Sequence, residues 1–147
     1  MKKMLQRILV LALAATIFVM PASTVLAASN PVVVYKADDC IIINFEPDPM
    51  YLSPGYGFDF PNYADATRDW YVPAGKKLVF QVFTSEPNTT VRAQIYKNGN
   101  LIQDTATWST IYGYIFEYAP ESVDNRYTFV LTALADMHLI GYSAILA

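Results

Sequence analysis

The chain has too few cysteine and histidine residues for a disulfide framework or for an ordinary zinc site. Cys40 is the only cysteine among 147 residues, so no disulfide can form within the chain. His138 is the only histidine, and one histidine with one cysteine cannot complete a zinc site without several carboxylates. Cys40 opens the apolar run CIIINF, so we expect it to be a small buried hydrophobic residue.

Recognisable catalytic groupings are missing as well. No serine lies in the glycine pattern of a nucleophile elbow, and His138 would need a serine from elsewhere for a Ser-His-Asp site. Because His138 lies two residues after Asp136, a strand would place both on one face, and we expect a half-exposed strand histidine. The acidic residues could supply paired carboxylates for glycoside hydrolysis, but their spacing specifies no pair. We therefore predict that the chain is not an enzyme.

The N-terminus has the three parts of an export signal. Three basic residues precede an uncharged run over residues 8–20, which is too short for a transmembrane helix. A proline and mostly small residues follow, in the pattern of a cleavage site ending at Ala27 or Ala28. We therefore predict a helical signal peptide over residues 1–27, and a mature domain of residues 28–147 that is secreted to the extracellular space, as in bacteria.

Positive charge is scarce once this leader is removed. The leader holds three of the ten basic residues and none of the thirteen acidic ones, so the formal net charge falls from −3 to −6. No basic stripe remains to meet phosphates, so we expect neither nucleic acid nor an anionic membrane as a partner.

Residue types and spacing favour strands throughout the mature part. It is rich in Val, Ile, Thr, Tyr and Phe, and no stretch keeps apolar residues at helical spacing for three turns. Turn signals separate these strands, at Asp38–Asp39, at Pro73–Gly75 and near Ala135–Asp136. We predict an all-β fold, an antiparallel β-sandwich or jelly roll of about eight strands.

The most specific local prediction is a hairpin over residues 92–106. Asn98–Gly99 is the preferred pair for a two-residue type I′ turn. Alternation before the turn puts Val91, Ala93 and Ile95 on one face of the first strand.

Residues 47–68 depart from this strand pattern, with four prolines, two glycines and many aromatic residues. So long a connection in a small domain is usually functional or mobile. Exposed tyrosines give rigid contact area for sugar rings or protein surfaces. The predicted ligand-binding residues are Tyr51, Tyr56, Phe58, Phe60 and Tyr63. The alternative is that Phe58 and Phe60 simply cover one end of the core.

The same segment offers oxygen ligands for a cation. Aspartates on loops between strands can bind calcium, and Asp48, Asp59 and Asp65 are the candidates here. No EF-hand spacing is present, so the alternative is a set of solvated acids that keep the protein soluble. We expect no other cofactor.

Two stretches resemble the bacterial pre-peptidase C-terminal type of β-sandwich. In WYVPAGKKLVFQV (residues 70–82), a V-P-A-G turn leads into an apolar strand, as in that family. In YIFEYAPESVDNRYTFVLTAL (residues 114–134), a late A-P turn leads into a closing strand. The family's glycine before the late tyrosine is absent, because Asn125 and Arg126 precede Tyr127. The resemblance implies a non-catalytic accessory domain of secreted proteins.

Three functions remain open at this point. The first is a non-enzymatic extracellular module that binds a glycan or a protein surface through the aromatic loop. The second is a self-associating structural subunit that pairs its N- or C-terminal strands with those of neighbours, since CIIINF and KLVFQVF (residues 77–83) are apolar and prone to β-pairing. The third is a secreted inhibitor or effector.

Overall fold

The computed structural model describes residues 32–46, 48–109 and 112–147. Within these residues the chain forms eleven strands, and every strand pair is antiparallel. The part of the chain described contains no helix long and apolar enough to cross a membrane. The predicted signal peptide and its cleavage site lie outside the described residues.

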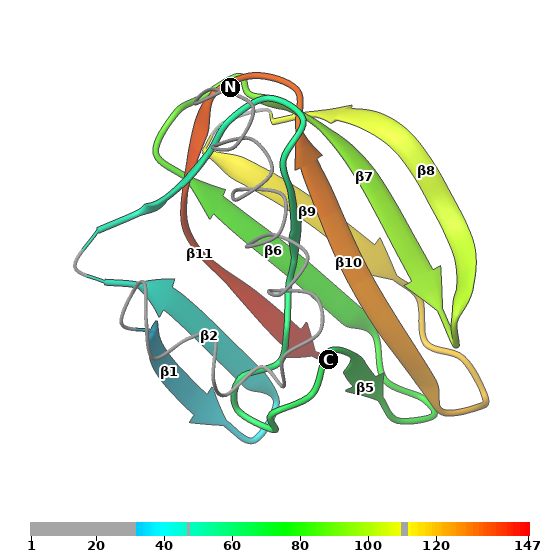
Figure 1. Cartoon of the computed structure of the whole chain (residues 1–147). Coiled ribbons are helices and arrows are strands. Elements are labelled where there is room, and N and C mark those ends of the chain that lie inside the picture. Colours follow the sequence, from blue (N-terminus) through cyan, green and yellow to red (C-terminus); the bar gives the residue numbers. More distant parts are fainter. Residues whose placement is uncertain (1–31, 47, 110–111) are drawn as a thin grey trace, which may run out of the picture.

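The strands form two sheets that pack face to face as a β-sandwich, which confirms the predicted fold class (Figure 1). The six-stranded sheet has the order β1-β2-β11-β6-β9, and β3 also pairs with β11, beyond the end of β2. Its strands are β1 (Val32–Ala37), β2 (Cys40–Phe45), β3 (Met50–Leu52), β6 (Leu78–Thr84), β9 (Gly113–Tyr118) and β11 (Met137–Leu146).

The five-stranded sheet has the order β4-β10-β7-β8, and β5 pairs with β10 next to β4. Its strands are β4 (Gly57–Asp59), β5 (Trp70–Val72), β7 (Thr90–Lys97), β8 (Asn100–Trp108) and β10 (Asn125–Ala133). Four connections lie at the upper end of the sandwich in Figure 1, namely β3–β4, β6–β7, β8–β9 and β10–β11. We call this the apical end and the opposite end the basal end.

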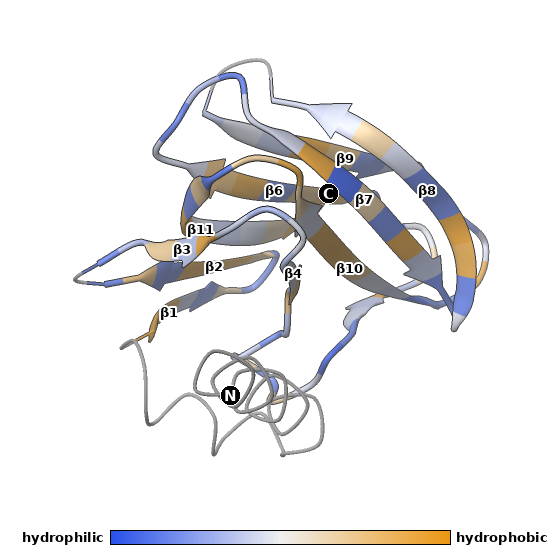
Figure 2. Ribbon diagram, turned by 45° about the horizontal axis from the view of Figure 1, so that its top comes forward, coloured by the Kyte–Doolittle hydropathy of each residue, from blue (hydrophilic) through white to orange (hydrophobic). Residues whose placement is uncertain are grey.

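Alternating side chains build the core between the sheets. Along β6, β7 and β10 buried and more exposed residues alternate, and Figure 2 shows the same alternation of hydropathy on the ribbon. This is the period-2 pattern of strands with one buried face. Phe80 of β6 and Phe129 of β10 stack at the centre, with ring centroids 3.9 Å apart. Aromatic and aliphatic side chains from both sheets therefore share one core.

The predicted hairpin is confirmed. β7 and β8 pair around Asn98–Gly99, where the φ angles are 50° and 80°. Positive φ at both central residues is what a type I′ turn requires. Val91, Ala93 and Ile95 are fully buried, on the face that the alternation indicated.

Residues 48–68 contain more regular structure than the sequence indicated. Two short strands, β3 and β4, pair with the ends of β11 and β10, and Asn62 forms a bridge with Thr67. These strands, together with the short β5, raise the count above the expected eight. Prolines and glycines keep each piece too short for an alternation to be read in the sequence, and the long partner strands supply the pairing.

The two runs prone to β-pairing are interior strands. CIIINF forms β2, between β1 and β11, and KLVFQVF lies mostly in β6, between β11 and β9. β11 is interior too, so the predicted pairing of the C-terminal strand with a neighbouring molecule is wrong. β1 is an edge strand, and pairing through the N-terminal strand stays a prediction. Cys40, expected to be buried, is only half-buried at the start of β2.

Candidate functional site: the apical aromatic surface

Hydrogen bonds between backbones join the apical connections to one another. Gly55 donates to the carbonyl of Ala133 at 2.8 Å, and Ala133 donates to that of Tyr56 at 3.0 Å. On the other side, Thr84 donates to the carbonyl of Tyr112 at 2.9 Å. Loops fixed in this way hold their side chains in place before a ligand arrives, which lowers the entropic cost of binding.

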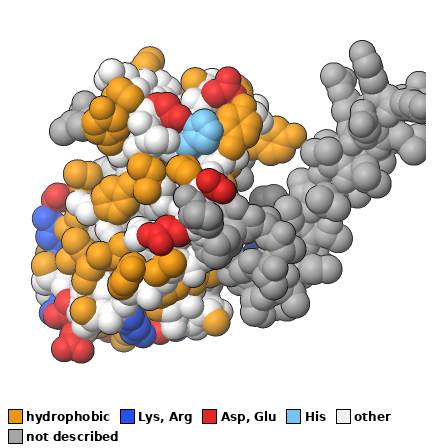
Figure 3. Space-filling view, turned by 90° about the vertical axis from the view of Figure 1, so that its left-hand side faces the viewer, with side chains coloured by type: hydrophobic (Ala, Val, Ile, Leu, Met, Phe, Trp, Pro, Cys, Tyr) orange, Lys and Arg blue, Asp and Glu red, His pale blue; other side chains and the backbone are white. Residues whose placement is uncertain are grey.

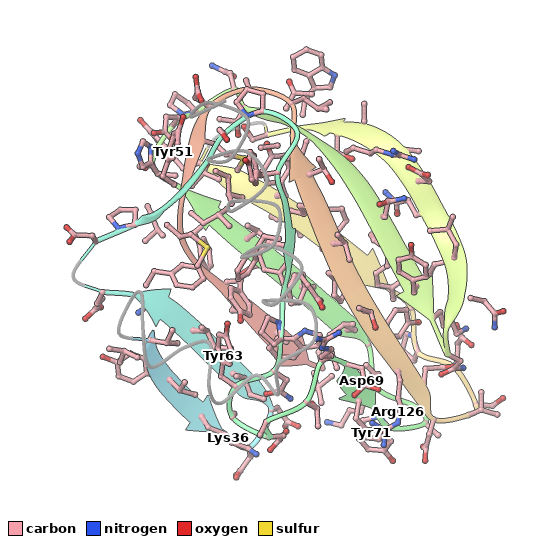
Figure 4. All side chains as sticks on the ribbon, viewed as in Figure 1. Lys36, Tyr51, Tyr63, Asp69, Tyr71 and Arg126 are labelled. Atoms are coloured by element: carbon pink, nitrogen blue, oxygen red, sulfur yellow. The ribbon has the colours of Figure 1, made fainter. Side chains whose placement is uncertain are left out.

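Four strongly exposed aromatic residues lie at this end. Tyr51, the middle residue of β3, is 54 % exposed, and Tyr56 in the β3–β4 connection is 50 % exposed. Trp108 at the end of β8 is 71 % exposed, and Tyr112 just before β9 is 56 % exposed. We call these four residues the apical aromatic surface. Figure 4 labels Tyr51 at this end of the sandwich.

The other three predicted ligand-binding residues pack against the core. For Phe58 and Phe60 this agrees with the alternative that they cover one end of the core. Phe60 is fully buried and packs edge-to-face on Phe58 and Tyr142, with ring centroids 4.8 Å and 5.0 Å away. Phe58 and Tyr63 are half-buried against the core cluster. Burial raises the pKa of Tyr63 to about 12, since its hydroxyl is shielded from water. Complete burial excludes ligand contact for Phe60, and a role in ligand contact stays a prediction for Tyr51, Tyr56, Phe58 and Tyr63.

Trp108 and Tyr112 were not predicted as site residues. Trp108 precedes the β8–β9 connection and Tyr112 lies in it, and both line a half-open hollow of about 310 Å³, which we call the pocket. The pocket is bounded by Gln81, Val82, Phe83, Thr107, Trp108, Tyr112, Gly113, Tyr114 and Ile115. A usable signal was present in the sequence: the two rings lie four residues apart, between two strands. What the sequence does not show is that β6 lies beside them.

Buried hydroxyl groups support the base of this pocket. The Tyr114 hydroxyl lies 2.6 Å from Thr89 Oγ1, which lies 3.2 Å from Ser109 Oγ. Thr89 also donates its backbone N–H to Ser109 Oγ at 2.8 Å. Gly113 matters here because a Cβ at that position would lie 1.9 Å from the Val82 carbonyl oxygen. These contacts fix Ser109 and Gly113 on either side of the β8–β9 connection, and therefore the position of Trp108 at the end of β8.

A second group of side chains surrounds Tyr51. The Tyr51 hydroxyl donates to Asp136 Oδ1 at 2.5 Å, and the Tyr51 and His138 ring centroids are 5.2 Å apart. His138 contacts Glu86 through both its ring and its backbone: Nδ1 lies 2.5 Å from Oε1, and the backbone N–H donates to Oε2 at 2.8 Å. Figure 3 shows the histidine among acidic and hydrophobic side chains. His138 is half-exposed on its strand, as predicted.

The hydrogen bonds also set ionisation in this group. Desolvation raises the pKa of the Glu86 carboxyl, but the hydrogen bonds from the His138 backbone and ring outweigh it and hold that pKa below its ordinary value. The bond to Asp136 raises the pKa of the Tyr51 hydroxyl. At neutral pH Glu86 is therefore an ionised acceptor and Tyr51 a neutral donor.

The three proposed calcium ligands do not form a common site. Among the described residues, no group of three acidic, histidine or cysteine side chains could hold a metal ion. Asp65 forms an ion pair with Lys36 at 2.5 Å. Asp59 is half-buried, with one carboxylate oxygen that has no hydrogen-bond partner, and burial raises its pKa. Asp48 is exposed in the connection before β3.

Most ion pairs lie away from the apical surface. Lys97 pairs with Glu121 at the basal end, and Arg126 pairs with Asp69 at 3.0 Å. Arg126 also lies over the ring of Tyr71, 5.5 Å from its centroid, as the three labelled residues at the basal end of Figure 4 show. Charge is thus concentrated at the end opposite the exposed rings.

No protein-family model matches the chain, and no curated protein matches it. Solved structures with similarity include a family two carbohydrate esterase from Cellvibrio japonicus, at 10 % identity and TM-score 0.42. The alignment covers 81 % of this chain and 34 % of the esterase, so this chain corresponds to about a third of that protein.

Carbohydrate-binding modules are also among the similar structures. TmCBM61, solved in complex with β-1,4-galactotriose, has 13 % identity and TM-score 0.39, over 80 % of this chain and 88 % of that one. A family 35 carbohydrate binding module from Clostridium thermocellum has 12 % identity and TM-score 0.30, over 78 % and 97 %. At such identities the similarity concerns the fold only.

Proposed function

We propose that this protein is a non-enzymatic, extracellular module that binds a glycan through the apical aromatic surface. The observation that carries the proposal is the gathering of Tyr51, Tyr56, Trp108 and Tyr112 at one end of the sandwich. Exposed rings on a fixed scaffold give contact area at low entropic cost, because few rotamers are lost on binding. The faces of sugar rings carry C–H groups, which pack well on such aromatic faces.

Polar groups beside these rings fit the hydroxyl groups of a sugar. Thr107 and Gln81 line the pocket below Trp108, and a pocket with few polar groups on apolar walls is typical of ligand sites. His138 and Asp136 stand beside Tyr51 in the same way.

Glu86 is not suited to be the general acid of a glycosidase. A glycosidase needs a carboxylic acid with a raised pKa to protonate the leaving group. The pKa of Glu86 is lowered by its bonds to His138. Glu86 is thus suited to hold His138 in place.

The proposal can be tested by retention on insoluble cellulose, mannan and galactan. We expect the native mature protein to be retained on at least one polymer, and Trp108→Ala combined with Tyr112→Ala to weaken that retention by about tenfold or more. Tyr35→Ala is the matched control, since Tyr35 is 56 % exposed on β1 and outside the apical end. Equal retention of the double variant and the native protein would refute the proposal.

A further inference from the structure

The apical connections carry negative charge and no positive charge. In the sequence, the β3–β4, β6–β7, β8–β9 and β10–β11 connections contain two acidic residues, Glu86 and Asp136, and no lysine or arginine. Both acids stand beside exposed rings, because Asp136 accepts from Tyr51 and Glu86 contacts His138, which packs on Tyr51. A ligand that covers Tyr51 is therefore brought near two carboxylates.

The nearest basic side chain on the flanking strands is already neutralised. Arg92, early in β7, donates from Nε and Nη2 to both carboxylate oxygens of Asp104, each at 2.6 Å. Such a two-point bond is the strongest pairing that arginine makes with a carboxylate. Five further ion pairs involve Lys36, Lys76, Lys77, Lys97 and Arg126, each with an acidic partner. Together with Arg68, whose charge acts on the Asp59 carboxyl, these are all the lysines and arginines of the described residues, and none lies in an apical connection.

The hydrogen-bonding state of His138 follows from its partner. An ionised carboxylate can only accept hydrogen bonds, so Nδ1 of His138 must carry the proton that lies toward Glu86. The Nδ1–H···Oε1 hydrogen bond therefore fixes the His138 ring between Glu86 and Tyr51.

We propose that the apical site selects neutral sugars and rejects uronic acids and sulfated sugars. The inference rests on the proposed glycan binding and adds the class of glycan. Glu86 and Asp136 repel an anionic group placed near Tyr51, whereas a neutral sugar meets no such repulsion. Electrostatic repulsion of this kind is a usual source of specificity, because it penalises the wrong ligand without strengthening the right one.

The experiment compares each polymer with its own oxidised form. Cellulose, mannan and galactan are used native and after oxidation of C6, so that ring stereochemistry is unchanged and the primary alcohol becomes a carboxylate. We expect any polymer that retains the native protein to lose about tenfold or more in affinity on oxidation at low salt. The difference should shrink as salt is raised, because salt screens exposed charges.

Two variants test whether Glu86 and Asp136 cause the discrimination against oxidised polymers. Glu86→Gln and Asp136→Asn should each reduce the ratio of native-polymer to oxidised-polymer affinity, because each variant removes one of the two negative charges. Asp136 is an exposed turn residue, so this second variant keeps the test available if Glu86→Gln destabilises the fold. Glu117→Gln is the control, because Glu117 lies on the basal half of β9, paired with Lys77.

The outcomes separate this inference from the proposed function. Equal or stronger binding of the oxidised polymers overturns the selectivity while glycan binding stands. Absence of retention on all polymers in both forms overturns the proposed function and this inference with it. Unchanged discrimination in both acid variants overturns the assignment to Glu86 and Asp136.

Discussion

The two tryptophans of this chain show how position decides what a side chain does. Trp70 is 2 % exposed, and its Nε1 donates to the Phe60 carbonyl at 2.8 Å, which satisfies the polar end of a buried ring. Trp108 is 71 % exposed at the end of an edge strand. The first ring stabilises the core, whereas the second offers an apolar face to a ligand.

Substitutions of Phe60 and Tyr56, which lie in one segment, test the difference between a ring in the core and an exposed ring. Phe60→Ala should lower the free energy of unfolding by about 3–5 kcal/mol, because it leaves a cavity among Phe58, Phe80 and Tyr142. Tyr56→Ala should change it by no more than about 0.5 kcal/mol, since Tyr56 is exposed. Urea denaturation followed by circular dichroism measures both. A Phe60→Ala variant as stable as Tyr56→Ala would contradict the core assignment.

The sequence could not sort these rings by itself. Prolines and glycines interrupt residues 47–68 every few positions, so no run is long enough to reveal a buried face. The face that each ring takes depends on β10 and β11, whose paired residues come about 70 to 90 residues later in the chain. Composition therefore indicated that the segment was unusual but not which of its rings were exposed.

At the scale of elements, local turn chemistry was the most reliable guide. Asn98 occupies the left-handed region in the β7–β8 turn, and it also bonds outside the turn. Its Oδ1 accepts from the Arg126 backbone N–H at 2.8 Å, and its Nδ2 donates to Asn125 Oδ1 at 2.9 Å. The turn predicted from two adjacent residues thus also anchors the start of β10.

This double role gives a prediction for the hairpin. Gly99→Ala should cost about 1 kcal/mol of unfolding free energy, because alanine disfavours the positive φ at that position. Asn98→Gly keeps the turn but removes both side-chain bonds to β10. We therefore expect this variant to lose about 1 kcal/mol of unfolding free energy relative to the native protein. Thermal and urea unfolding of the two variants measure these costs. If Asn98→Gly proves as stable as the native protein, the anchoring role is wrong.

Strand pairing was predictable locally but not across the fold. The antiparallel neighbours β1–β2 and β7–β8 follow one another in sequence, and a turn signal marks each connection. The turn signal near Ala135–Asp136 instead joins β10 and β11, which lie in different sheets. The placement of β11 between β2 and β6 brings together strands separated by about 60 to 100 residues. Such pairings depend on the whole core, and no short pattern encodes them.

For the whole molecule, the two ends of the sandwich differ in character. The basal end holds ion pairs and hydrogen-bonded turns, such as Asp124, which accepts from the Ala74 backbone and the Tyr71 hydroxyl, each at 2.8 Å. The apical end holds exposed rings, a pocket and two carboxylates. The sequence predicted a binding face formed by one loop. The structure instead assembles the apical aromatic surface from separate connections of both sheets.

The most direct test of glycan binding at this surface uses the fluorescence of Trp108. Acrylamide quenching should be strong for Trp108 and weak for buried Trp70, so the native protein reports mainly on the apical end. We predict that soluble oligosaccharides of the cellulose, mannan or galactan type protect the native protein from quenching, and that Trp108→Phe shows no such protection. Quenching that stays the same at saturating concentrations of all three, or protection that persists in Trp108→Phe, would contradict the account.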